Sequence, residues 1–162
     1  MDLEPTCEMI AVSYVQVQAG GFNYKLEEFP ASQVSAAIAN YGSESCIVTA
    51  VAYDTSANEW VLISYGWQGD TTTVYDSQAV VIPGTNAQSG TWSEAQTLAS
   101  QGYFISAFGG DPTDGYLMVG MRVQGDTLPR PIMAGTTTVP ANADNAPWTA
   151  VIWQHPGSVV EQ

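Results

Sequence analysis

Residues 59–71 read EWVLISYGWQGDT, and residues 115–127 read GYLMVGMRVQGDT. Each stretch is an apolar, strand-like run that closes on the same Gln-Gly-Asp-Thr turn, and the two copies lie 56 residues apart. Two copies are too few for a solenoid, which stacks three or more repeats. The sequence therefore predicts one domain over residues 1–162, in which a duplicated module folds back on its twin.

A short helix is predicted ahead of each copy. Residues 31–42 begin near Ser32, a candidate N-cap, and end at a glycine. Residues 91–102 open with Thr91 and Glu94 at capping-box spacing and also end at a glycine. Each helix spans only about ten residues, so it must pack against a sheet to be stable.

Strand-like runs make up most of the remaining sequence. They predict a hairpin from residues 9–18 and 22–29, a three-strand meander from 46–53, 59–67 and 72–82, strands at 103–109 and 116–123, an irregular strand at 127–139 and a last strand at 148–154. Along 59–67, alternation puts Val61, Ile63 and Tyr65 on one face, which we expect to line the core. The opposite face, with Trp60 and Leu62, is also too apolar to meet water alone.

These elements define the expected fold class. We predict an α+β domain, mainly an antiparallel twisted sheet or partly closed β-barrel with two short helices. An internal pseudo-twofold repeat should relate residues 31–82 to residues 91–139. The ends of the chain, 1–8 and 156–162, are expected to be flexible termini.

Charge narrows the range of partners. Sixteen acidic residues oppose only Lys25, Arg122 and Arg130, so the net charge is −13. Nucleic acid is not expected as a partner, because basic side chains bind the phosphates and the release of counterions drives that binding. An anionic membrane is not expected because the negative charge of the chain would be repelled by it. No apolar run reaches the roughly 18 residues of a membrane span. We expect a cytoplasmic protein, or a secreted one whose leader has been removed.

Metal and nucleophilic chemistry have little support in the sequence. The chain holds a single histidine, His155, and two distant cysteines, Cys7 and Cys46. These do not form a zinc-binding set, and no nucleophile is spaced to work with the histidine. We predict two free thiols, no metal, no cofactor and no catalytic residue.

Five residues are candidate ligand contacts. Arg122 lies within an apolar strand and needs either a carboxylate partner or a ligand. Asp70 and Asp126 occupy the two repeated turns and could form a polar site on one rim, although a purely structural role in the turn is the main alternative. Trp60 and Tyr116 offer rings for stacking, with core packing as the alternative.

The sequence leaves the function open among three classes. We expect a non-catalytic binding or interaction module, homo-oligomeric, that recognises a small molecule or a protein partner through an apolar, aromatic sheet face. The first alternative is a small barrel-type cyclase or isomerase, which requires an enclosed apolar cavity. The second is a structural role as a secreted or particle-surface subunit, which would carry a disulfide and a large obligate interface.

Overall fold

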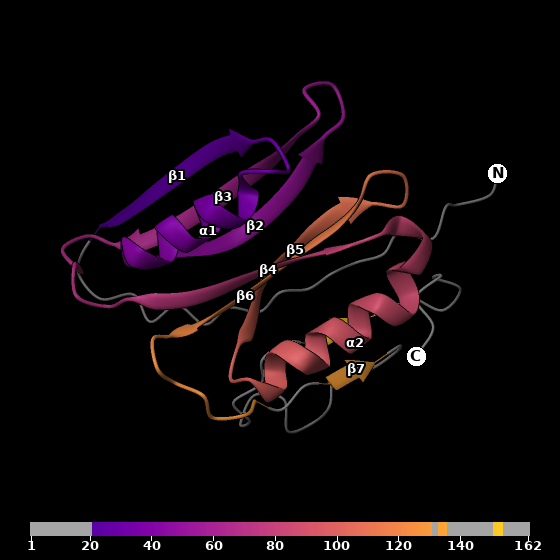
Figure 1. Cartoon of the computed structure of the whole chain (residues 1–162). Helices are drawn as coiled ribbons and strands as arrows, with labels where there is room; N and C mark the ends of the chain where they lie inside the picture. Colours follow the sequence, from indigo (N-terminus) through magenta and orange to yellow (C-terminus); the bar gives the residue numbers. More distant parts are fainter. Residues whose placement is uncertain (1–20, 131–132, 136–150, 154–162) are drawn as a thin grey trace.

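The computed structural model describes residues 21–130, 133–135 and 151–153. Over these ranges the chain folds as an α+β protein with two three-stranded antiparallel sheets and two helices (Figure 1). The expected fold class and its internal repeat are confirmed, because each sheet belongs to one of two similar strand-helix-strand-strand halves.

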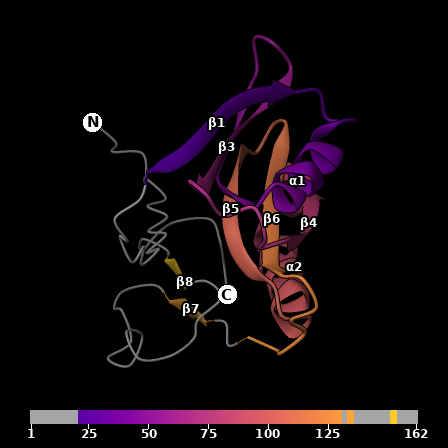
Figure 2. The same cartoon turned by 90° about the vertical axis from the view of Figure 1, so that its left-hand side faces the viewer.

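The first sheet has the order β1-β3-β2 and the second the order β4-β6-β5. The first half consists of β1 (Phe22–Phe29), α1 (Val34–Ser43), β2 (Cys46–Asp54) and β3 (Glu59–Trp67). The second half consists of β4 (Tyr75–Ile82), the 3-10 turn η1 (Gly84–Asn86), α2 (Ala87–Ser100), β5 (Phe104–Asp111) and β6 (Gly115–Val123). Two short strands, β7 (Met133–Gly135) and β8 (Val151–Trp153), pair in parallel. Figure 2 shows both helices toward one side of the molecule and β1 toward the other.

Matching irregularities show how closely the halves agree. A β-bulge interrupts β2 at residues 48–50 and β5 at residues 105–107. Within each bulge a hydroxyl, from Thr49 or Ser106, donates to a carbonyl oxygen of the neighbouring strand, at 3.5 and 3.3 Å. A bulge bends and twists its strand, so the same bend is built into both sheets.

The hairpin turns repeat as well. Asp54 and Asp111 each accept backbone N–H groups from residues two and three positions later. Each turn then needs a left-handed residue, supplied by Asn58 at φ 61° and by Gly115 at φ 94°. Asparagine and glycine are the residues that adopt this conformation most readily.

The expected meander is wrong in its third strand. Residues 75–82 form β4, which pairs with β6 and opens the second half. The cause lies in the turn after β3, where Gly69 has φ 93° and the Asp70 carboxylate accepts the N–H groups of Thr72 and Thr73. These local hydrogen bonds carry the chain to the other sheet, so the repeated unit runs over 22–67 and 75–123.

Several other expectations fall near or outside the described ranges. The strand predicted at 127–139 is not present at 124–130, where Pro129 cannot donate a ladder hydrogen bond, and β7 covers only Met133–Gly135. The strand at 148–154 is represented by β8. The hairpin strand at 9–18 and the termini at 1–8 and 156–162 lie outside the described residues.

The core face of β3 is the reverse of the prediction. Trp60, Leu62 and Ser64 are fully buried, whereas Tyr65 is exposed. Helix α1 covers the Trp60 face, since Ile38 and its neighbours belong to the same core cluster. Alternation alone could not decide between two apolar faces, because the choice depends on which one receives the helix.

Strand β6 is buried on both faces. Leu117, Val119 and Met121 face the first half, in one core with α1, β2 and β3. Met118 faces α2 and packs with Leu98 in a second core. Described elements therefore cover the second sheet on both sides and the first sheet on one.

The halves approach each other through backbone contacts that only glycine permits. A Cβ added at Gly109 of β5 would lie 2.1 Å from the carbonyl oxygen of Val51 in β2, and one at Gly42 of α1 would lie 2.4 Å from that of Tyr75 in β4. Both contacts join backbone to backbone, so neither neighbour can move aside cheaply.

No helix among the described residues is long and apolar enough to cross a membrane. Cys46 is a buried free thiol, as expected, and burial raises the pKa of that thiol. Cys7 lies outside the described residues.

Gly109→Ala should destabilise the fold by more than about 2 kcal/mol, because the new methyl group overlaps the Val51 carbonyl oxygen. The matched control is Gly125→Asn, since Gly125 has no neighbour within 4 Å and asparagine tolerates its positive φ. Urea denaturation followed by tryptophan fluorescence measures both changes. Equal midpoints for the two variants would contradict the close approach of β2 and β5.

Candidate functional site

The first sheet has one face turned away from α1, which we call the outer face. Ladder register places residues of all three strands on it. Its members are Phe22, Tyr24, Leu26 and Glu28 of β1, Glu59, Val61, Ile63, Tyr65 and Trp67 of β3, and Ile47, Ala50, Ala52 and Asp54 of β2. Most of them are apolar, so this face resembles a core surface in composition.

Four large side chains of the outer face are open to solvent. Tyr24 is 71% exposed and Leu26 58%, while Tyr65 and Phe22 are 43% and 41% exposed. Single exposed hydrophobic residues are ordinary on protein surfaces, but a contiguous group on one sheet face marks an interaction site. No described helix covers this face, whereas α2 covers the second sheet.

Aromatic rings at one end of the face support one another. The ring of Phe22 lies 4.4 Å from that of Trp67, its partner across the ladder, and 6.5 Å from that of Tyr65 in an edge-on arrangement. Tyr24 lies 6.3 Å from Tyr65. Such cross-strand pairs restrict the rotamers available to each ring, so the surface is organised before any partner binds.

The opposite end of the face is acidic. Glu28, Glu59 and Asp54 lie there, beyond the aliphatic middle of the strands. Neither Glu28 nor Glu59 takes part in an ion pair between described residues. Asp54 stays ionised because hydrogen bonds from the Ser56 hydroxyl and the turn backbone lower its pKa. The face therefore runs from aromatic through aliphatic to negatively charged.

All three cations of the chain are held in ion pairs. Lys25 pairs with Glu44, Arg122 with Asp76 at 3.2 Å and Arg130 with Asp126 at 2.6 Å. The remaining acidic groups have no lysine or arginine left to pair with. A partner that is to be attracted by charge must therefore supply the positive groups itself.

Of the five residues predicted as ligand contacts, Trp60 and Tyr116 pack in separate cores. Trp60 is 2% exposed and lies between α1 and the first sheet. Tyr116 packs at the second core, stacked on Phe108 with ring centroids 5.4 Å apart and planes at 4°. Core packing was the alternative expected for both rings.

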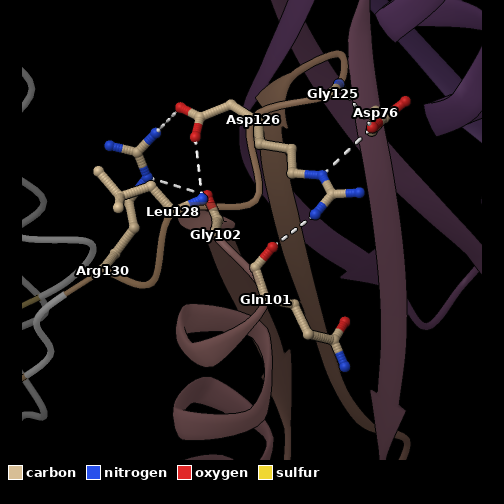
Figure 3. Close-up of polar contacts among 8 residues, drawn as sticks. Asp76, Gln101, Gly102, Gly125, Asp126, Leu128 and Arg130 are labelled. Carbon is tan, nitrogen blue, oxygen red and sulfur yellow. Dashed lines mark hydrogen bonds and ion pairs between the residues drawn. The ribbon is translucent and has the colours of Figure 1, made fainter.

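Arg122 has the carboxylate partner that its burial requires. Its Nε donates to Asp76 and its Nη1 to the carbonyl oxygen of Gln101 (Figure 3). Its guanidinium also lies 4.4 Å from the ring centroid of Tyr103. Arg130 likewise donates to the carbonyl of Gly102, at 2.9 Å. Both guanidinium groups sit at the carboxyl end of α2, where positive charge is favourable.

The two turn aspartates have structural contacts. Asp126 accepts from Arg130 and, through its other oxygen, from the N–H of Leu128 (Figure 3). Asp70 accepts the N–H groups of Thr72 and Thr73, both at 3.0 Å. Each carboxylate thus organises the turn that carries it. The structure places Arg122 and Asp126 around the same helix end and the other three candidates elsewhere.

Sequence reasoning missed the residues of β1. The signal was present, because Phe22, Tyr24 and Leu26 alternate with polar residues, but alternation normally points the apolar side inward. Here the polar side of β1 faces α1. Lys25 pairs with Glu44, the residue that follows the helix, and Glu27 accepts a hydrogen bond from the Tyr41 hydroxyl. This contact turns the apolar side of β1 outward.

Comparison with known proteins gave no relative from which a site could be transferred. The chain matches no protein-family model, and neither a curated protein nor a solved structure shows significant similarity to it. Among the described residues, no three histidine, cysteine, aspartate or glutamate side chains are grouped so as to hold a metal ion.

Asp70 should stabilise the fold only while it is ionised. Hydrogen bonds from the Thr73 hydroxyl and from the N–H groups of Thr73 and Thr72 lower its pKa to about 2. Because this value lies below the ordinary one of about 3.9, the contribution is complete above about pH 4 and is lost as the pH falls towards 2.

Asp70→Asn keeps an oxygen acceptor but does not titrate. The wild-type protein should therefore lose more stability than this variant when the pH is lowered from about 4 to about 2, the pKa of Asp70 in the folded protein. Urea midpoints of both proteins at the two pH values measure the difference. An equal loss in both would show that the turn does not depend on the charge of Asp70.

Proposed function

We propose that this protein is a non-catalytic binding module whose recognition surface is the outer face of the first sheet. The observation that carries the proposal is the exposure of Phe22, Tyr24, Leu26 and Tyr65 on one contiguous face. A protein partner suits this surface best, since it is an extended sheet face that carries exposed aromatic rings.

The composition of the chain supports a binding role over a catalytic one. General acid–base work relies most often on histidine, and the chain has only His155. Lys25, Arg122 and Arg130 are all engaged in ion pairs that hold the fold. Apolar contact and negative charge are thus the means of recognition that the outer face offers.

A second copy of the chain is one candidate partner, as the expected homo-oligomer would require. Joining two outer faces would bury the exposed rings of both copies. However, each copy carries a net charge of −13, and this repulsion opposes self-association at low salt. Another protein with basic groups meets no such opposition.

Site-specific photo-crosslinking tests the proposal. A benzophenone amino acid replaces Tyr24 on the outer face or, as a control, Val81 of β4, which is 54% exposed and lies off this face. In an extract of the source cells, position 24 should give a discrete covalent product and position 81 should not. Intact mass of the product distinguishes a protein, a small molecule and a second copy.

A supporting variant should weaken the product without unfolding the protein. Leu26→Lys places a charge in the aliphatic middle of the face, so the yield from position 24 should fall by about tenfold. Circular dichroism verifies that the fold is retained. Equal products from positions 24 and 81, or a yield unchanged by Leu26→Lys, would rule the outer face out as the binding surface.

A further inference from the structure

The internal repeat contains an occupied counterpart of the outer face. In the second half, the face of β6 with Leu117, Val119 and Met121 corresponds to the face of β3 with Val61 and Ile63. Leu117, Val119 and Met121 are completely buried, whereas Val61 and Ile63 lie on the open outer face. What covers the buried counterpart therefore indicates what shape and chemistry suit the open one.

The counterpart is covered by α1 together with β2, since Val48 of β2 belongs to the same core and its N–H contacts the sulfur of Met121. Val34, Ile38 and Tyr41 of α1 share a core with the β6 residues, and Tyr75 and Ala79 of β4 pack against that core. The helix comes close to the sheet because Gly42 has no side chain, and a Cβ added there would lie 2.4 Å from the Tyr75 carbonyl oxygen. The helical part of the covering surface is thus a stripe of small and aliphatic residues with one tyrosine.

The dimensions of the outer face also suit one helix. Three strands about 4.8 Å apart span roughly 10 Å between the outer two, which is close to the diameter of an α-helix with its side chains. Phe22 and Leu26 of β1 occupy the positions that Tyr75 and Ala79 hold on β4. One helix laid along the strands would cover the face.

We infer that the outer face binds an amphipathic helix of another protein. The helix carries a stripe of small and aliphatic residues, and basic side chains at the end that meets Glu28 and Glu59. The charge requirement follows because these carboxylates lack ion pairs among described residues and the chain has no free lysine or arginine. This inference rests on the proposed function and specifies its partner.

The described helices of a second copy do not fit this description. The exposed side chains of α2 include Ser93, Gln96, Thr97 and Ser100, all of them polar. Those of α1 include Ser35, Asn40 and Ser43, which interrupt its small alanines. Neither helix offers a free apolar stripe, and the charge of the chain repels another copy.

A helix is also favoured over an added strand. Among the described residues β1 pairs only with β3, so its free edge has unpaired backbone groups that a strand could use. A strand there would extend the sheet sideways and leave the rings of Tyr24 and Tyr65 exposed. A helix buries those rings and leaves the edge unchanged.

The test uses the full chain and a stapled helical peptide. The peptide repeats the Val, Ala, Ile and Tyr spacing of α1 and carries two lysines at one end. Fluorescence anisotropy should show saturable binding to wild type, about tenfold weaker to Leu26→Lys and unchanged for Val81→Lys. A peptide of the same composition with alternating, strand-forming order should bind at least tenfold more weakly.

Charge reversal tests the acidic end. Replacing the two lysines of the peptide by glutamates should abolish binding to wild type. The double variant Glu28→Lys and Glu59→Lys should recover binding of the glutamate peptide and lose that of the lysine peptide. Recovery by exchange requires direct complementarity, which a general loss of stability cannot imitate.

Other occupants would overturn the inference in distinct ways. Stronger binding of the strand-forming peptide would assign the site to the β1 edge. An intramolecular crosslink from position 24 would assign the face to the chain itself, and a dimer dispersed by Leu26→Lys would assign it to a second copy. If position 24 captures a partner while the helical peptide fails to bind, only the helix inference fails and the proposed function stands.

Discussion

Helix α1 is the constraint on which the rest of the structure depends, because both sheets use it. Its apolar side chains share one core with β3 of the first sheet and β6 of the second. Gly42 lets the helix approach β4, and Gly109 lets β5 approach β2. The helix and the close contact of β2 with β5 together fix the relation between two halves that share no ladder of hydrogen bonds. This arrangement gives the second sheet a cover on each side.

The same arrangement explains why duplication did not give equal surfaces. Each helix lies on the corresponding face of its own sheet, α1 against Trp60 and α2 against Met118. The other face of the second sheet then meets the first half, whereas that of the first sheet meets no described element. A repeat joined in head-to-tail fashion always leaves one such face unmatched. Here that face carries the exposed rings.

The sequence predicted most of the elements because local chemistry repeats. Gly102 after α2, the Asp54 and Asp111 turns and the existence of β2, β3, β5 and β6 were readable from the local sequence. The predicted helix bounds were wrong, since Gly42 lies inside α1 and α2 begins at Ala87, ahead of Thr91. It predicted less well which strands pair, since the turn at Asp70 sends the chain to a different sheet. The site was missed for a related reason. Which apolar face of β1 and β3 is buried depends on where a distant helix packs, and strand alternation holds no information about that position.

The order of the two modules gives the assembly a direction. In the observed pair, the helix of the earlier module covers the sheet of the later one. If a further module of the same kind lay ahead of β1, its helix would therefore contact Tyr24 and Leu26. Extension at the opposite end would meet α2, whose exposed side is polar. The duplication is therefore directional: among the described elements, the uncovered sheet face belongs to the first module and the uncovered helix side to the second.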